Sequence, residues 1–166
     1  DDVTLTFRAY SSSNNYVDGT LLLTTGKSTV KPAFTYEVSP GGQVSLDEDD
    51  FYDFFRNNTS SGSLQYVIFD RPGSSVFADG ILYYDYGGRD EIAFSRSTLA
   101  NGTFYYGGSY DEDNAEYDLD NLTFVAGKSF KDDVTLSFRA YYSSSRYVDG
   151  TVTITTGKSS STTSNN

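Results

Sequence analysis

The carboxylates are the side chains of this sequence best suited to chemistry, and they gather in two clusters. The first cluster lies within 47–53 and the second within 111–120. Calcium takes about six to eight oxygen ligands, which acidic loops of β-sandwich proteins can supply. The sequence therefore predicts calcium as the one candidate cofactor, with these metal-ligand candidates: Asp47, Asp49, Asp50, Asp111, Asp113, Asp118 and Asp120.

The alternative is that the chain binds no cofactor. An EF-hand loop needs Gly at its sixth position and Glu at its twelfth, and the stretch 111–122 has Glu116 and Leu122 there. On this alternative the first cluster caps a helix and the second is a solvated loop.

Catalytic chemistry is poorly supported by the residue types present. Paired carboxylates can hydrolyse glycosides, but in so acidic a chain such pairs also arise by chance. The sequence contains no His and no Cys, which removes the commonest acid–base and nucleophilic groups. A Gly-x-Ser-x-Gly nucleophile motif is also missing. We therefore expect a non-enzymatic protein.

Tyrosines form a second set of candidates, this time for binding. The chain has 15 Tyr and no Trp, and alternation along 82–86 turns some rings outward. Exposed rings can stack on sugars or on a neighbouring subunit. The ligand-binding candidates are Tyr84, Tyr86, Tyr105 and Tyr106. The alternative is that such rings pair across strands and stabilise a sheet.

Charge and hydropathy exclude two kinds of partner. The formal net charge of −11 repels phosphate backbones, so we expect no nucleic-acid binding. No run of 18 apolar residues occurs in the sequence, so we expect no membrane insertion by this segment.

The elements that position these side chains are organised by an internal repeat. Residues 1–28 and 132–159 are identical at 21 of 28 positions, 131 residues apart. Self-similarity at a fixed period is typical of repeat architectures. The sequence predicts a hairpin from a preceding repeat at 1–28, a complete β-sandwich repeat at 29–159 and a polar linker or tail at 160–166.

Each copy of the repeated segment predicts a β-hairpin. Apolar and polar residues alternate along 134–140, as in a strand with one buried face, and a second strand follows at 151–155. The apolar positions of the first strand are the same in both copies: Val3, Leu5 and Phe7 in one, and Val134, Leu136 and Phe138 in the other.

The region between the copies predicts many short strands and one helix. Strand patterns occur at 34–38, 43–46, 64–69, 80–86, 103–106 and 122–125. The helix is predicted at 47–55, where Asp47 can cap it and three Phe residues fall on one face. This pattern predicts an all-β protein: an antiparallel immunoglobulin/cadherin-like β-sandwich with one short helix.

The order of these segments resembles repeats of large bacterial surface proteins. Those repeats are cadherin-like or immunoglobulin-like and often accompany S-layer homology domains in Gram-positive bacteria. The resemblance rests on 122–125, Phe130, 134–140 and 150–154, and it spans about 34–155. The chain departs from the shared pattern at Ala126, where Pro is common, and at 132–133, where a turn Gly is usual.

The resemblance implies an extracellular structural role on a bacterial cell surface or cell wall, as a stalk, adhesin or self-assembling filament. Its partners are then copies of itself, neighbouring repeats, or glycans and other host or cell-wall surfaces. A carbohydrate- or ligand-binding β-sandwich module is the alternative.

The hairpin at 1–28 leaves two hypotheses open. In one, it completes the sandwich of an adjoining unit, which gives a head-to-tail fibre. In the other, repeats are ordinary covalent beads and each hairpin belongs to its own bead.

Overall fold

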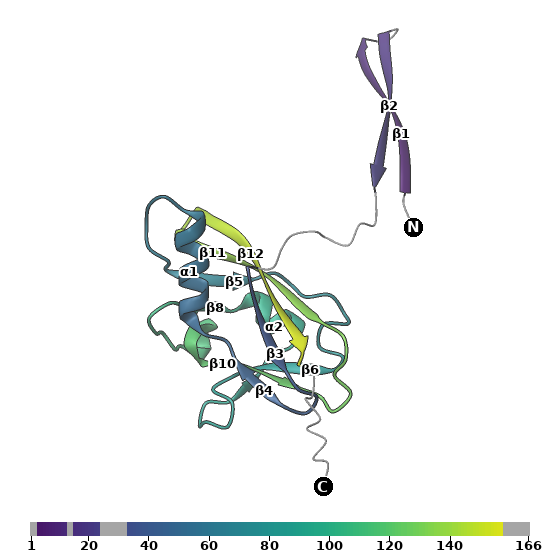
Figure 1. Ribbon diagram of the computed structural model, residues 1–166. Helices are drawn as coiled ribbons and strands as arrows, with labels where there is room; N and C mark the ends of the chain where they lie inside the picture. The colour runs from purple at the N-terminus through teal and green to yellow at the C-terminus, as the bar shows by residue number, and fades with distance from the viewer. Residues whose placement is uncertain (1–2, 13–14, 24–32, 158–166) are drawn as a thin grey trace. The chain divides into compact units, whose positions relative to one another are not determined.

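The computed structural model describes residues 3–12, 15–23 and 33–157. The chain divides into two units, Asp1–Lys31 and Pro32–Asn166 (Figure 1). The predicted tail at 160–166 lies outside the described residues.

The first unit is a two-stranded antiparallel sheet. Its strands are β1 (Val3–Ser12) and β2 (Asn15–Leu23). Val3 pairs with Leu23, Leu5 with Leu21 and Phe7 with Gly19, so the predicted apolar positions of this hairpin all lie in β1.

The second unit contains two sheets. The six-stranded sheet has the order β3 (Phe34–Val38), β12 (Arg146–Thr156), β11 (Val134–Ser143), β5 (Tyr66–Phe69), β8 (Thr103–Tyr105) and β9 (Glu116–Asp118). The four-stranded sheet has the order β4 (Gln43–Ser45), β10 (Leu122–Ala126), β6 (Gly80–Tyr84) and β7 (Ile92–Ala93). The helical elements are α1 (Glu48–Asn58), α2 (Arg96–Asn101) and the short 3₁₀ helices η1 (Glu112–Asn114) and η2 (Leu119–Asn121).

The prediction of a mostly β chain is confirmed, since 42% of residues are in strands and 18% in helices. The predicted antiparallel pairing is found for most neighbouring strands of the second unit, but β3 pairs with β12 and β8 with β9 in parallel. Parallel partners are joined by long connections, and alternation along one strand says nothing about the direction of a distant neighbour.

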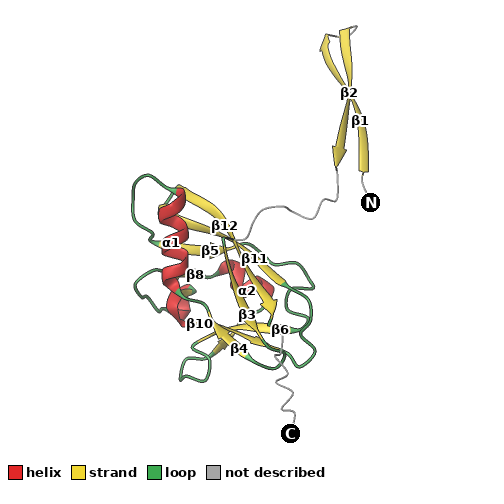
Figure 2. Cartoon of the chain, in the orientation of Figure 1, coloured by secondary structure: helices red, strands yellow, loops and turns green. Residues whose placement is uncertain are grey.

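Helix α1 lies where the sequence predicts it and continues to Asn58. The Asp47 carboxylate accepts a hydrogen bond from the amide of Asp49, which caps the helix. Phe51 and Phe55 are buried on the side of the helix that faces the core. Figure 2 shows α1 beside β11 and β12.

The expectation of a single helix is wrong, because α2 is a second one. Ser95 and Thr98 form a reciprocal capping box at its start. The helix has six residues and buries only Leu99, which is too short a segment to show helical periodicity in the sequence.

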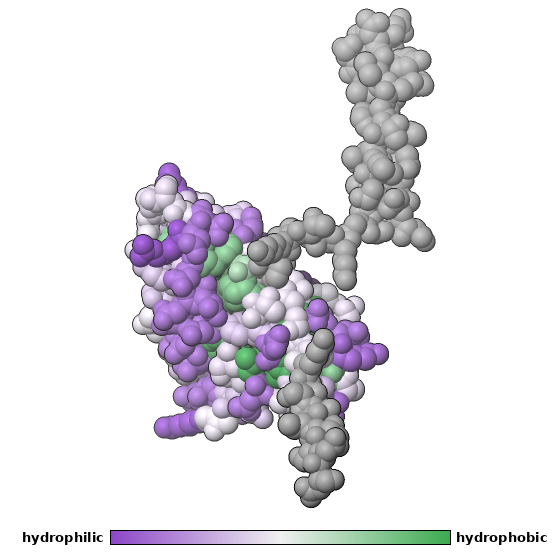
Figure 3. Space-filling model, viewed as in Figure 1, coloured by the Kyte–Doolittle hydropathy of each residue, from purple (hydrophilic) through white to green (hydrophobic). Residues whose placement is uncertain are grey.

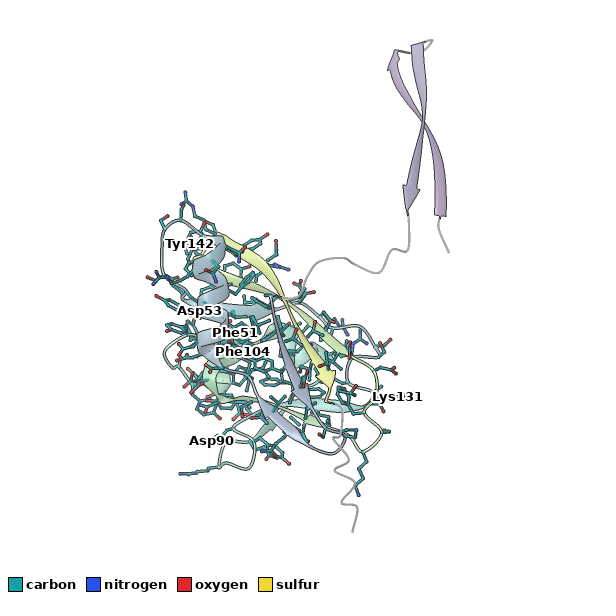
Figure 4. The ribbon with its side chains drawn as sticks, viewed as in Figure 1. Phe51, Asp53, Asp90, Phe104, Lys131 and Tyr142 are labelled. Carbon is teal, nitrogen blue, oxygen red and sulfur yellow. The ribbon has the colours of Figure 1, made fainter. Side chains whose placement is uncertain are left out.

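Both sheets and both helices contribute to one aromatic core in the second unit. The Phe51 ring of α1 lies 5.0 Å from the Phe138 ring of β11, edge to face. The Phe104 ring of β8 lies 5.3 Å from that of Phe69 on β5. Phe51 and Phe104 are both in the interior (Figure 4). Seen from this side, hydrophilic side chains dominate the surface along α1, with smaller apolar patches next to them (Figure 3).

The hairpin β11–β12 lies between β3 and β5 in the six-stranded sheet. Val134, Leu136 and Phe138 are buried, and so are Val152 and Ile154 on β12. Val134 pairs with Ile154, Leu136 with Val152 and Phe138 with Gly150. Shifted by 131 residues, this is the register of β1 with β2.

Candidate functional site

A line of four tyrosines crosses the six-stranded sheet on the face opposite the core. Along β11, the buried positions alternate with positions that face away from the core, and Tyr141 is one of the latter. The register pairs Tyr141 with Tyr147 of β12 on one side and with Tyr66 of β5 on the other. Tyr66 pairs in turn with Tyr105 of β8. We call Tyr105, Tyr66, Tyr141 and Tyr147 the tyrosine row.

The rings of the tyrosine row contact one another in sequence. The centroids of Tyr66 and Tyr141 are 4.8 Å apart with planes inclined by 16°, which is a stacked pair. Tyr141 lies 5.1 Å from Tyr147, and Tyr66 lies 5.7 Å from Tyr105. Tyr147 is 46% exposed and the other three are half-buried. The row therefore offers aromatic surface to solvent across four strands, while also forming the cross-strand pairs that stabilise a sheet.

Charged groups border both ends of the tyrosine row. Arg139 donates a hydrogen bond to Asp70 at 2.6 Å and lies over the Tyr147 ring at 5.5 Å. At the other end, the Tyr105 hydroxyl donates to Glu116 at 3.3 Å. Desolvation and the neighbouring Glu116 carboxylate raise the pKa of Tyr105, which favours the neutral hydroxyl that donates this hydrogen bond.

Of the tyrosine row, only Tyr105 is among the ligand-binding candidates predicted from the sequence. Burial alternates along the strands of Tyr66 and Tyr141, although the sequence of β5 is apolar throughout. That alternation assigns them to the outer face. Their alignment depends on which strands are neighbours, and a single strand's pattern does not contain that information.

The other predicted binding tyrosines lie elsewhere. Tyr84 is 4% exposed and stacks on Tyr110 at 5.2 Å, so its ring is not open to a ligand. Tyr86 is 41% exposed and lies 5.0 Å from Tyr83. Tyr106 stacks on Tyr52 of α1 at 5.0 Å and 9°. The structure thus does not bring the four predicted tyrosines together.

The first acidic cluster is used largely to hold α1 in place. Asp47 caps the helix, and Asp50 accepts a hydrogen bond from the Tyr36 hydroxyl of β3 at 2.6 Å. Asp49 accepts from Tyr106 at 3.5 Å, and Glu48 accepts from the amide of Gly107 at 2.9 Å. The capping by Asp47 is the role that the alternative assigned to this cluster, whereas the other three hydrogen bonds were not predicted.

The second acidic cluster is spread over the 3₁₀ segments. Asp111 accepts from the side chain of Asn114 at 2.7 Å, and Asp118 accepts from the amide of Asp120 at 3.1 Å. Asp113 is exposed on η1. Asp118 and Asp120 lie close enough to Glu48 to act on it: burial raises the pKa of Glu48, and the charges of Asp118, Asp120 and Asp49 raise it further.

The structure therefore brings one end of each acidic cluster together, which the sequence did not indicate. Among residues 33–157, no group of three or more Asp or Glu side chains is arranged to hold a metal ion. Calcium binding stays a prediction for the seven candidate ligands.

An open groove lies on the four-stranded sheet. Its volume is about 320 Å³, and its lining includes Phe77, Ile81, Tyr83 and Val125. Asp79 accepts a hydrogen bond from Ser129 at 2.9 Å at the rim of the groove. Asp79 is the one charged residue among those that line the groove.

Comparisons with protein-family models, with curated proteins and with solved structures return no match. In the described part of the chain, no helix is both long and apolar enough to span a membrane.

Proposed function

We propose that this chain is a non-enzymatic structural repeat of an extracellular bacterial surface protein or fibre, of the immunoglobulin- or cadherin-like class. The observation that carries the proposal is the duplicated hairpin. Two segments 131 residues apart share their sequence and their strand register, and the second is the centre of a folded unit. A tandem array of one domain accounts for this arrangement directly.

The position of β11–β12 favours covalent beads over completion between chains. Phe138 of this hairpin contacts Phe51 of α1 and Phe69 of β5, so the hairpin fills the core of its own unit. A second hairpin could enter this place only by displacing the first. In an array of beads, β1–β2 is the corresponding hairpin of the preceding repeat.

The test is a chain in which residues 29–159 are joined three times in tandem. For covalent beads we expect a monodisperse particle by light scattering and a row of evenly spaced beads by electron microscopy. Filaments or large oligomers would instead favour completion between chains. Protein that fails to form equal beads would overturn the proposal of a tandem structural domain.

The same preparations test the metal. If the acidic clusters bind calcium, bead spacing or thermal stability changes between calcium and chelator. The charges of Asp118 and Asp120 act on Glu48, so Glu48→Gln is the test variant, and it should reduce any calcium effect. Identical behaviour in both solutions would leave the chain without a cofactor.

Carbohydrate binding is the second candidate function, and the tyrosine row favours it. The partly exposed rings on four neighbouring strands offer aromatic surface against which sugar rings can pack, and Arg139 and Asp70 next to them offer hydrogen-bonding groups. Glycan-array binding that is lost in Tyr66→Ala and kept in Tyr83→Ala, on the other sheet, would support it. An array without signals, or a signal equally reduced in both variants, would count against this function.

A further inference from the structure

We propose that the parallel pair β3–β12 is a mechanical clamp that resists force applied along the array. This inference rests on the proposed tandem arrangement and adds a function to it, which is bearing load.

The clamp follows from where the strands lie in the chain. β3 is the first strand of the second unit and β12 is the last, and they are hydrogen-bonded neighbours. They run parallel, in the register Val152 with Phe34 through Thr156 with Val38. In a tandem array the preceding repeat therefore pulls on the amino-terminal end of β3, and the following repeat pulls on the carboxyl-terminal end of β12.

The hydrogen bonds between β3 and β12 form a ladder, and the two loaded strand ends lie at opposite ends of it. Tension along the array thus draws the two strands past each other, parallel to their own axes. In this shearing geometry all hydrogen bonds of the ladder are strained together and must break within one small displacement. If both forces acted at the same end of the ladder, the bonds would open one after another, and the resistance would be that of a single bond.

The ladder is closed at both ends by further hydrogen bonds. The amide of Ala33 donates to the carbonyl of Thr151 at 2.8 Å, just before the first register pair. The amide of Gly157 donates to the carbonyl of Val38 at 3.0 Å, just after the last pair. The Thr155 hydroxyl also donates to the carbonyl of Tyr36 at 3.3 Å. Every part of β3 is therefore tied to β12.

Strand β3 is the edge of its sheet, so it must also be held from the core side. The Phe34 ring packs on the Phe51 ring of α1 at 4.8 Å, and Val38 is buried. The Tyr36 hydroxyl donates to Asp50 at 2.6 Å and accepts from the amide of Asp47 at 2.9 Å. These contacts attach β3 to the beginning of α1, so that the edge strand is held from the core side as well as by its pairing with β12.

The chain contains the junction through which this force would pass. β2 is the counterpart of β12 in the duplicated segment and has the same register, and residues 24–33 connect it to β3. Ten residues thus lead from the last strand of one copy to the first strand of the next, which is the path that an array requires.

Single-molecule pulling on the full chain tests the clamp. The sequence contains no Cys, so two introduced cysteines define the pulling direction. Lys31→Cys with Lys158→Cys loads β3 and β12 in shear. Ser39→Cys with Lys158→Cys pulls on the same ladder from one end, because Ser39 follows β3 as Lys158 follows β12. We expect a several-fold higher unfolding force in the first geometry at equal loading rate. Equal forces in the two geometries would overturn the clamp.

A pair of variants locates the resistance. Ala33→Pro removes the amide that donates to Thr151, whereas Ala33→Ser keeps it. We expect Ala33→Pro to lower the shear force and to leave the one-ended force unchanged, since that geometry opens the ladder from the Gly157 end. A fall of the same size in both geometries would mean a general loss of stability and would also overturn the clamp.

These results are separable from the test of the array. Evenly spaced beads with low shear resistance would remove the clamp and leave the tandem arrangement standing. High shear resistance without beads would leave the clamp as a property of one domain and overturn the array.

Discussion

The two copies of the hairpin, β1–β2 and β11–β12, form the same local structure in different surroundings. Each has a register shift at the same place, between Tyr10 and Ser12 in one and between Tyr141 and Ser143 in the other. The first copy is a sheet of two strands, whereas the second is flanked by β3 and β5 in a sheet of six. Residues 1–28 and 132–159 thus specify a hairpin, and the chain between them supplies the core.

The comparison separates local from tertiary contributions to stability. Turn chemistry and cross-strand pairs set the register of a hairpin, but a two-stranded hairpin alone is marginally stable in water. In the second unit, the same strands bury aromatic and aliphatic side chains against α1 and the neighbouring strands. Substitutions at matched positions of the two copies can therefore measure what the surroundings add.

The largest difference is expected for Phe138→Ala against Phe7→Ala. Phe138 is 1% exposed and contacts the rings of Phe51 and Phe54. Removing a buried Phe ring costs about 3–5 kcal/mol, so Phe138→Ala should lower the free energy of unfolding of the second unit by this amount. Phe7→Ala should leave that transition unchanged. Chemical denaturation followed by tyrosine fluorescence measures both.

Equal losses in these two variants would mean that Phe7 belongs to the same cooperative unit as Phe138. That result would contradict the conclusion that the two hairpins have different surroundings, because they would then share one core.

A second pair of variants adds volume instead of removing it. A Cβ at position 150 would lie 2.4 Å from Cζ of Phe138 and 2.8 Å from Phe54, since the Phe138 ring covers this glycine. Overpacking of this kind costs about 1–3 kcal/mol. Gly150→Ala should therefore destabilise the second unit, and Gly19→Ala, at the position paired with Phe7, should not. A neutral Gly150→Ala would show that the ring can move away from the backbone.

The sequence was sufficient to predict the features that depend on neighbouring residues. The hairpin at 134–155 and the buried positions Val134, Leu136 and Phe138 follow from alternation, and the start of α1 follows from Asp47 and the acids after it. Each of these features is specified by residues within a few positions of one another.

The features that depend on distant residues were not predictable in this way. The parallel pairing of β3 with β12 joins residues more than 100 positions apart, and both strands have the alternation of any one-sided strand. The tyrosine row needs the order of four strands, and the meeting of Glu48 with Asp118 needs the path of two loops. Alternation along 82–86 predicts that some of its rings face outward, but it did not show that Tyr84 is buried.

Tyr36→Phe tests how much the attachment of β3, the strand that pairs with β12 in the second unit, adds to stability. The variant removes the hydrogen bond to Asp50, which should cost about 1.5 kcal/mol at neutral pH. Burial raises the pKa of Tyr36, and the hydrogen bond to Asp50 raises it further. Since the unfolded chain releases this proton near about pH 10, the contribution is fully present below that pH and is lost as pH rises towards the folded pKa.

The difference in unfolding free energy between wild type and Tyr36→Phe should therefore shrink above about pH 10. A change of pH acts on the rest of the chain equally in both proteins, so the difference isolates Tyr36. A constant difference between neutral pH and pH of about 11 would contradict the role assigned to its hydroxyl.

The smallest difference is expected for Arg139→Ala against Arg8→Ala. Arg139 pairs in register with Asp149, as Arg8 does with Asp18, so the pairing within each hairpin is the same. Arg139 also forms an ion pair with Asp70, which directly follows β5. The side chains of Arg139 and Asp70 are 39% and 43% exposed. Pairs so open to solvent contribute about 0.2–1 kcal/mol, and salt weakens them. A double-mutant cycle with Asp70→Asn should give a coupling energy in this range that falls as salt is added.

The control is Arg8→Ala, which should show no coupling to Asp70→Asn, because β1 pairs with β2 and not with β5. A coupling energy near zero for Arg139 would mean that the ion pair with Asp70 contributes nothing to stability, and that the buried face alone distinguishes the two hairpins.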